Sequence, residues 1–297
     1  MAESLIDRIV RKQVWLEGPA DTLQKGVGAT YAGLGSAGRG LKNVLHGTWL
    51  LGHPFHPAIS DIPIGAWTVG VIADLVALST TSMPRAAGDL ALGIGILGAL
   101  LAALSGLTDY ADTFGHERRM AVSHGLLMSL ALVIDIISMA LRLWASSGAH
   151  GLAVVLAIIG WLVALGAAYL GGHLVFGIGT QVNRLAFAEG PDEFVDVGSS
   201  SDFAEGDKRL VEAGPMPVLL VRLGGVLRAI PNTCVHAGGP LNEGELSGTR
   251  ITCPWHGSTF DLRDGSVHNG PATFSQPSMV VREQNGRVEV KLAAPLH

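Results

Sequence analysis

The two cysteines of this 297-residue chain are each followed closely by a histidine. Cys234 and His236 form a C-x-H pair, and Cys253 and His256 form a C-x-x-H pair after sixteen intervening residues. Thiolates and imidazoles are metal ligands when they occur together at such short spacings. The pattern therefore predicts one metal centre with Cys234, His236, Cys253 and His256 as its ligands.

Three interpretations of this quartet are open. Cys/His quartets are most often zinc sites, but zinc does not require the glycines Gly238, Gly239 and Gly257 that follow the two pairs. A [2Fe–2S] cluster carries bridging sulfides, so small residues would let two loops close over it and direct backbone N–H groups toward sulfur. A disulfide would leave both histidines without a role. The neighbouring glycines favour the cluster, with zinc as the alternative.

The residues around the quartet resemble a known family. The run from Cys234 to Leu241 (CVHAGGPL) and the run from Cys253 to Phe260 (CPWHGSTF) resemble the two ligand loops of Rieske proteins. This resemblance implies that the cysteines bind one iron of a [2Fe–2S] cluster and the histidines bind the other. It also implies one-electron transfer to a protein redox partner through the exposed imidazole edge, with Pro240, Leu241, Trp255 and Pro271 shielding the cluster.

The loops depart from the respiratory Rieske type in two ways. That type carries an extra cysteine in each loop, and here Gly239 and Trp255 occupy those positions. It also carries a tyrosine where this chain has Phe260, although its serine is matched by Ser258. Fewer hydrogen bonds to sulfur lower a cluster's potential, so we expect a value near the bottom of the range of roughly −150 to +300 mV. This resembles Rieske ferredoxins and oxygenase components.

The region around the quartet has the pattern of an antiparallel β domain. Short runs of β-forming residues alternate with the turn signals Gly224-Gly225, Asp264-Gly265 and Asn285-Gly286, which are typical of hairpins. We expect a linker over 181–192 and an all-β Rieske-type antiparallel domain over 193–297.

The preceding region is strongly apolar. Mean hydropathy is +0.39 over the chain, and only 15% of residues are charged. Four apolar segments, 62–80, 87–107, 120–145 and 152–178, are each close to the roughly 20 residues that cross a bilayer. Small residues recur every fourth position on two of them, at 91, 95, 99 and 103 and at 160, 164, 168 and 172, which permits close helix packing. We therefore expect an α-helical, four-span transmembrane bundle over 61–180.

Charge predicts the orientation of this bundle. Basic residues on the N-terminal side of the spans number nine, against two on the other side, Arg85 and Arg142. The positive-inside rule then places both termini, and the Rieske domain, on the cytoplasmic side of a bacterial inner membrane. Residues 1–60 are expected to lie at the lipid interface or to dock against the protein. The net charge of −5, without a basic patch, excludes nucleic acid as a partner.

Histidines accompany the expected spans. The run from Gly52 to Gly65 (GHPFHPAISDIPIG) resembles domain-of-unknown-function family 2231, a family of four-helix bacterial membrane domains. His124 and His173 are the pair that we expect to serve as axial ligands of a haem b, because both should lie inside helices. His53 and His56 are candidates for a metal edge or a quinone hydrogen bond. The alternative is that these histidines only cap helices and contact the interface.

Two acidic residues are expected inside the membrane. Asp74 and Asp135 should lie at similar depths, where an unpaired carboxylate is costly. Arg142 lies two turns beyond Asp135 on the same helix face and could reach it. Proton transfer and plain structural hydrogen bonding are both open.

These observations together predict a membrane protein that transfers electrons. The first hypothesis is transfer between a cytoplasmic protein and a haem or quinone in the bundle. The others are a tethered Rieske ferredoxin that serves a separate oxygenase or reductase, and a cluster-based redox sensor. A catalytic oxygenase is disfavoured, because its non-haem iron domain would need several hundred further residues.

Overall fold

The computed structural model describes residues 5–80, 82–145 and 147–296. The chain divides into two compact units: a helical unit of Met1–Leu41 with Phe55–Thr180, and a β unit of Lys42–Pro54 with Gln181–His297. The segment 42–54 and the expected linker 181–192 thus both fold with the β unit. Their buried side chains explain this, since Leu185 joins the β core and His46 is fully buried.

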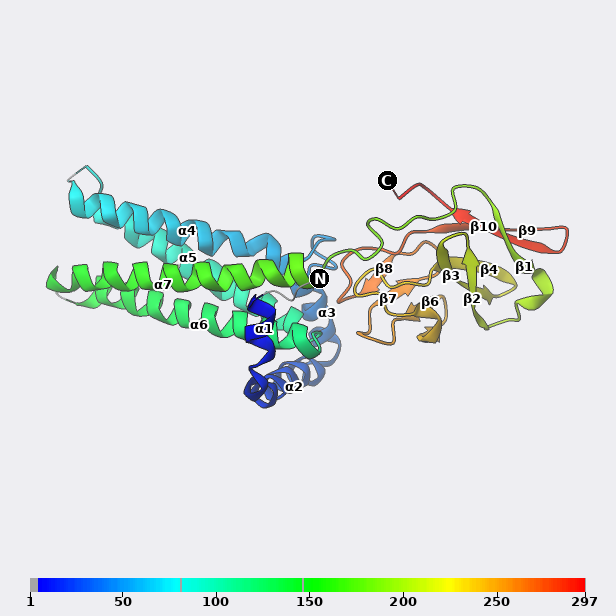
Figure 1. Cartoon of the computed structure of the whole chain (residues 1–297), viewed down its shortest axis with the longest axis horizontal. Coiled ribbons are helices and arrows are strands. Elements are labelled where there is room, and N and C mark those ends of the chain that lie inside the picture. Colours follow the sequence, from blue (N-terminus) through cyan, green and yellow to red (C-terminus); the bar gives the residue numbers. More distant parts are fainter. Residues whose placement is uncertain (1–4, 81, 146, 297) are drawn as a thin grey trace. The chain divides into compact units, whose positions relative to one another are not determined.

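Among the described residues, four helices of the helical unit are long and apolar enough to cross a membrane. They run side by side (Figure 1), and they are α4 (Phe55–Ser79), α5 (Arg85–Tyr110), α6 (Gly115–Trp144) and α7 (His150–His173), the last continuing as the π-helical turn η3 (Leu174–Ile178). The expected bundle is confirmed, but α4 begins seven residues before the expected span. Pro57 is tolerated in its first turn, where backbone N–H groups have no helical partner. His56 therefore lies inside the helix.

Small residues line the contacts within two helical hairpins, α4–α5 and α6–α7. A side chain at Gly95 would meet the Trp67 ring at 2.3 Å, and one at Gly160 would meet the Asp135 carboxylate at 2.5 Å. The buried stripes continue through Ala102 and Ala167, one residue earlier than the expected positions 103 and 168. A straight helix has 3.6 residues per turn, so a strict four-residue repeat drifts off the contact face.

A buried ion-pair group joins three of these helices. Arg142 on α6 donates to Asp74 on α4, at 2.9 and 2.5 Å, and to Asp89 on α5 at 2.8 Å. The side chains of Arg142 and Asp74 are 1% and 2% exposed, whereas that of Asp89 is 38% exposed. The expected contact of Arg142 with Asp135 is replaced by this group. Within the described residues, the buried oxygens of Asp135 have no hydrogen-bond partner.

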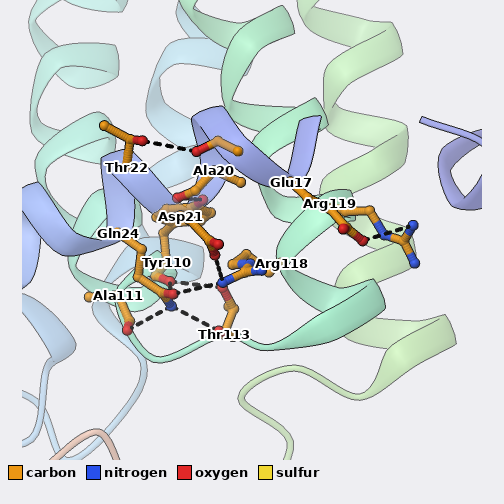
Figure 2. Close-up of polar contacts among 11 residues, drawn as sticks. Glu17, Ala20, Asp21, Thr22, Gln24, Tyr110, Ala111, Thr113, Arg118 and Arg119 are labelled. Carbon is orange, nitrogen blue, oxygen red and sulfur yellow. Dashed lines mark hydrogen bonds and ion pairs between the residues drawn. The ribbon is translucent and has the colours of Figure 1, made fainter. Parts of the chain in front are cut away.

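Four helical segments precede the bundle: α1 (Leu5–Arg11), η1 (Val14–Leu16), α2 (Glu17–Gly33) and α3 (Gly35–His46). Of these, α1 packs on α6, and α2 packs on α5 and α6. Figure 2 shows Gln24 of α2 reaching the loop after α5, where its amide donates to the carbonyls of Ala111 (3.0 Å) and Thr113 (2.9 Å). The Tyr110 hydroxyl donates to the Ala20 carbonyl at 2.7 Å, and Arg118 pairs with Asp21. Docking against the protein therefore accounts for α2.

The β unit consists of three antiparallel sheets. The first has the order β1-β10-β9, the second β2-β3-β4 and the third β5-β6-β7-β8. Their strands are β1 (Val195–Ser199), β2 (Lys208–Ala213), β3 (Met216–Leu223), β4 (Val226–Pro231), β5 (Glu245–Ser247), β6 (Arg250–Thr252), β7 (Thr259–Asp261), β8 (Val267–Asn269), β9 (Met279–Gln284) and β10 (Arg287–Leu292).

Hairpin turns and two cores hold these sheets. Gly224-Gly225 and Asn285-Gly286 both adopt positive φ, as two-residue hairpin turns require. One core, which includes Val218 and Val290, lies between the first two sheets. The other contains both cysteines together with Leu219 of the second sheet, Ile251 of the third sheet and apolar residues of the loops. The expected all-β domain is confirmed.

The ion-pair group predicts an order of stability for two acidic variants. Asp74→Asn leaves Arg142 buried with its charge balanced only by half-exposed Asp89, so we expect a loss of about 3–5 kcal/mol, the usual cost of breaking a buried pair. Asp89→Asn keeps the buried pair and should cost much less. Thermal unfolding of the detergent-solubilised protein, followed by far-UV circular dichroism, measures both; equal losses would contradict the assignment.

The segment 42–54 predicts a second effect. The Asn43 side chain accepts from the Gly270 N–H at 2.7 Å and donates to the Asn269 side chain at 3.0 Å, and Asn43 is 4% exposed. Asn43→Ala should therefore destabilise the β unit by about 1–3 kcal/mol, because buried polar groups lose their partners. Denaturant unfolding followed by tryptophan fluorescence tests this, with the exposed Gln284→Ala as the matched control. An unchanged midpoint would show that the segment does not support the β unit.

Candidate metal centre

Two loops of the β unit carry the cysteine–histidine pairs. The first follows β4 and is closed by an antiparallel bridge between Thr233 and Pro240, and the second connects β6 to β7. Sheet pairing fixes the bases of both loops, with Thr252 opposite Thr259 beneath the second. The β sheets therefore present both ligand pairs from the tips of anchored loops.

The two loops have the same backbone hydrogen bonds. In the first, the Cys234 N–H donates to the Gly239 carbonyl (2.9 Å) and the Gly238 N–H donates to the Cys234 carbonyl (2.8 Å). In the second, Cys253 and Gly257 make the corresponding bonds at 2.8 and 3.1 Å, with Ser258 in place of Gly239. Gly238 and Gly257 have φ of 84° and 78°, a region that favours glycine. These glycines thus shape both loops alike.

The two thiol groups meet in the interior. Cys234 and Cys253 are 1% and 2% exposed, and their side chains share a hydrogen bond. This shared bond, together with burial, raises the pKa of Cys234, whereas accepting it lowers the pKa of Cys253 to about 6. The two sulfurs therefore lie close enough for one to donate to the other, and a bound metal would take the place of this contact because coordinating thiols are deprotonated.

Backbone N–H groups point at both sulfurs. Those of His236 and Ala237 donate to Cys234, and those of Trp255 and His256 donate to Cys253, in each case lowering the pKa of the thiol. Hydrogen bonds of this kind stabilise negative charge on sulfur. The loops are thus built for two thiolates.

The histidines form a second pair beside the cysteines. The rings of His236 and His256 have centroids 4.8 Å apart and planes inclined at 81°, and both residues are partly exposed. In the described part of the chain, no group of three or more His, Cys, Asp or Glu side chains could hold a single metal ion. Two thiols and two imidazoles, each grouped as a pair, match the ligand division of a Rieske [2Fe–2S] cluster.

Gly239 provides a second test of the fit. A Cβ atom at this position would lie 2.8 Å from the Cys253 sulfur and 3.0 Å from the Trp255 ring. Only glycine leaves that space beside the sulfur open, as closure of two loops over a cluster requires. Leu241 is buried beside the cysteines, whereas Trp255 is 54% exposed. The residues present therefore fit a [2Fe–2S] cluster, with the cysteines on one iron and the histidines on the other.

A third loop, formed by the end of β8 and residues 270–274, packs against the second ligand loop. The Ala272 N–H donates to the buried Ser258 hydroxyl at 2.9 Å, and Pro271, expected to shield the cluster, is buried here. Segment 42–54 holds this loop, since Thr48 donates to the Ala272 carbonyl and Trp49 donates to the His268 carbonyl, both at 3.0 Å. Sequence reasoning missed this role, because nothing local marks residues 200 positions away as partners.

The structure gives the histidines of the helical region different surroundings. The rings of His56 and His124 lie 6.2 Å apart. His173 instead contacts Asp7 of α1 at 2.9 Å, and His116 contacts the same carboxylate oxygen at 2.8 Å. His53 belongs to the β unit, where its ring lies against Phe274. The structure thus pairs His124 with His56, and the expected partner His173 with Asp7.

Comparisons with known proteins agree with this site. Residues 193–288 match the family "Rieske [2Fe-2S] domain", and residues 52–184 match the family "Predicted membrane protein (DUF2231)". The ferredoxin component of biphenyl 2,3-dioxygenase from Rhodococcus jostii is 35% identical over 94 residues, which are 32% of this chain and 88% of that protein. Ferredoxin CarAc of Metapseudomonas resinovorans is 32% identical over 98 residues, 33% of this chain and 92% of that protein.

Other similar proteins are much longer or are known as structures. Human apoptosis-inducing factor 3 is 37% identical over 90 residues, and the match spans 30% of this chain but 15% of that protein. A solved complex of reduced oxygenase and oxidized ferredoxin in carbazole 1,9a-dioxygenase contains a chain 32% identical to this one, with a TM-score of 0.32, covering 34% of this chain and 94% of that chain. The ligand loops, the paired thiols and the apolar helices thus agree with the family matches: the chain joins a membrane domain of the DUF2231 family, over residues 52–184, to a Rieske [2Fe–2S] domain over residues 193–288.

Proposed function

We propose that this protein is a membrane-anchored Rieske electron carrier, which passes single electrons between a cytoplasmic protein partner and a redox group in its helical bundle. The observation that carries the proposal is the pair of buried thiols, joined by a hydrogen bond and each receiving backbone N–H groups, beside a pair of partly exposed imidazoles. The cluster would supply one-electron redox chemistry with little change in geometry.

The buried cysteines and the partly exposed histidines of the site would have different roles. Cys234 and Cys253 would hold the inner iron in a dry environment, where N–H groups balance the sulfur charge. His236 and His256 would hold the outer iron and present their ring edges near the surface. Trp255, half exposed and 6.4 Å from the His256 ring, offers an aromatic contact for a protein partner. Electrons would therefore enter or leave on the imidazole side.

The distribution of charge supports cytoplasmic placement of this domain at the bacterial inner membrane. Arg118 and Arg119 lie at the start of α6, at the same end of the bundle as α1 and α2, and both pair with acidic residues of α2. Membrane lipid would surround the apolar helices. Fusing a reporter to the C-terminus tests the orientation: green fluorescent protein should fluoresce, whereas alkaline phosphatase should be inactive. The reverse result would refute this placement.

A tethered ferredoxin is the second candidate. The Rieske domain is homologous to ferredoxin components of oxygenase systems, so the bundle could act only as an anchor for a carrier that serves a separate oxygenase or reductase. The paired histidines within the bundle favour the first proposal, since an anchor has no need of them. A quinone that accepts a hydrogen bond from the bundle is the alternative redox group.

The cluster assignment predicts a spectroscopic result. The full-length protein, purified in detergent and reduced with dithionite, should show a Rieske EPR signal, and Cys253→Ser should lose it because a hydroxyl is a poor ligand for this cluster. Trp255→Ala should keep it, since Trp255 only covers the site. Optical spectra and iron and sulfide analysis accompany the EPR. A fully iron-loaded wild-type sample without the signal would overturn the assignment.

Gly239 yields an independent test of the same geometry. Gly239→Ala places a methyl group 2.8 Å from the Cys253 sulfur, so we expect at least a several-fold loss of bound iron while the domain remains folded. Iron content per chain and far-UV circular dichroism measure the two effects separately. Normal iron content in Gly239→Ala would show that this space is not needed for the cluster.

A further inference from the structure

The two helical hairpins of the bundle repeat one another. On α4, His56 Nδ1 lies 2.9 Å from the Ala102 carbonyl of α5, and a side chain at Gly106 would press on the His56 ring. On α6, His124 Nδ1 lies 2.8 Å from the Ala167 carbonyl of α7, and a side chain at Gly171 would press on the His124 ring. The same offset in residue number relates Ala102 to Ala167 and Gly106 to Gly171. Both histidines are therefore held in the same way.

Further positions obey the same correspondence. The offset in residue number that relates His56 to His124 also relates Trp67 to Asp135, and both of these side chains are buried. Trp67 packs against Gly95 and Asp135 packs against Gly160. The offset between these glycines is the one that relates Ala102 to Ala167. The repeat thus extends well over two helical turns from the histidines, through positions whose side chains differ in chemistry. It is a property of the hairpin backbone.

Corresponding residues also meet between the hairpins. The His56 and His124 rings lie 6.2 Å apart. The same offset relates Asp74 to Arg142, which form the buried ion pair at 2.5 Å. Contacts between equivalent residues are what a two-fold axis between two copies of a unit produces. The histidines therefore lie at one end of a pseudo-two-fold axis, and the ion pair lies farther along it.

The hydrogen bonds determine which nitrogen of each histidine is available. A carbonyl oxygen can only accept, so the Nδ1 atoms of His56 and His124 must carry the protons in these bonds. Each neutral ring then has its lone pair on Nε2. Histidines that bind metals usually donate their other N–H in this way, which orients the ring and raises its basicity. The pair thus has the tautomer of a metal ligand.

The spacing suits one ion between the rings. Metal–nitrogen bonds of about 2 Å, with about 1 Å more from each nitrogen to its ring centre, place two imidazole centroids about 6 Å apart on opposite sides of an ion. A structural zinc ion takes four protein ligands, whereas a haem iron takes its remaining two from side chains. Packing between the hairpins is also sparser than packing within them, so a group on this axis would lie where the helices contact one another least.

We propose that His56 and His124 are the two axial ligands of a b-type haem, bound on the pseudo-two-fold axis between the α4–α5 and α6–α7 hairpins. This proposal deepens the proposed function. The haem site is argued from the geometry of the bundle, and only the role of the haem as the redox group of the bundle rests on the proposed function. In that role the ferric iron takes one electron from the reduced cluster and becomes ferrous, or returns it, with no bond broken. His173 and His53 are not ligands, because Asp7 and Phe274 engage them.

The test uses full-length protein expressed with a haem precursor and purified in detergent. Reduced-minus-oxidised optical spectra and pyridine haemochrome analysis should show about one b haem per chain, low-spin by EPR. His56→Ala and His124→Ala should each lower bound haem at least tenfold. His173→Ala and His53→Ala are the matched controls and should retain it. Haem retained in both single variants, or lost equally in the controls, would overturn the assignment.

Two additional measurements distinguish loss of an axial ligand from misfolding of the bundle and from loss of the cluster. His124→Met should still bind haem but shift its visible and EPR spectra, because one axial ligand changes while the bundle stays folded; unchanged spectra would refute ligation by His124. The Rieske EPR signal is recorded on every sample. A full Rieske signal in haem-supplied wild-type protein that has no Soret band would refute the haem site and leave the proposed electron carrier intact. Loss of the Rieske signal alone, in wild-type protein that still binds haem, would refute the proposed electron carrier and leave the haem site intact.

Discussion

Two thiols buried side by side impose the main constraint on the β unit. Thiolates in a dry interior repel one another and lose their hydration, so they persist only where positive charge or hydrogen-bond donors compensate them. Four backbone N–H groups, two for each sulfur, supply part of this compensation, and the irons of the cluster would supply the rest. The matching loop conformations, the positive φ of Gly238 and Gly257 and the open space at Gly239 all serve this one arrangement.

The support of the site extends beyond the ligand loops. The third loop contacts the second through Ser258, and segment 42–54 holds the third loop with Asn43, Thr48 and Trp49. This segment leads directly into α4, and only two residues lie between His53 of the β unit and His56 of the helical unit. The chain therefore passes from the part that supports the metal centre to the membrane domain without an intervening linker.

The helical unit follows a different constraint, the cost of polar groups in hydrocarbon. Arg142 is neutralised by Asp74 and Asp89, and the N–H groups of His56 and His124 are satisfied by helix carbonyls. Both solutions need partners from a neighbouring helix at matched depth. The repeated hairpin provides them, because a two-fold arrangement brings equivalent positions together.

Much of this protein could be predicted from its sequence, because the relevant signals are local. Two Cys–His pairs with adjacent glycines identify a cluster-binding loop pair, since loop conformation depends on a few neighbouring residues. Four apolar segments of sufficient length identify the bundle, since the bilayer sets that length. Stripes of small residues on α5 and α7 were predicted correctly, but with a period of four residues rather than 3.6. The last residues of each stripe were therefore misplaced.

Only the tertiary structure decided the long-range pairings. The sequence favoured Asp135 as the partner of Arg142 and His173 as the partner of His124, because spacing within one helix or inferred depth was all that it offered. The structure instead joins Arg142 to Asp74 and His124 to His56. It also joins Asn43 to a loop more than 200 residues away. Sequence spacing determines which residues share a helix face or a loop, but the packing of separate helices and sheets determines which of those faces meet.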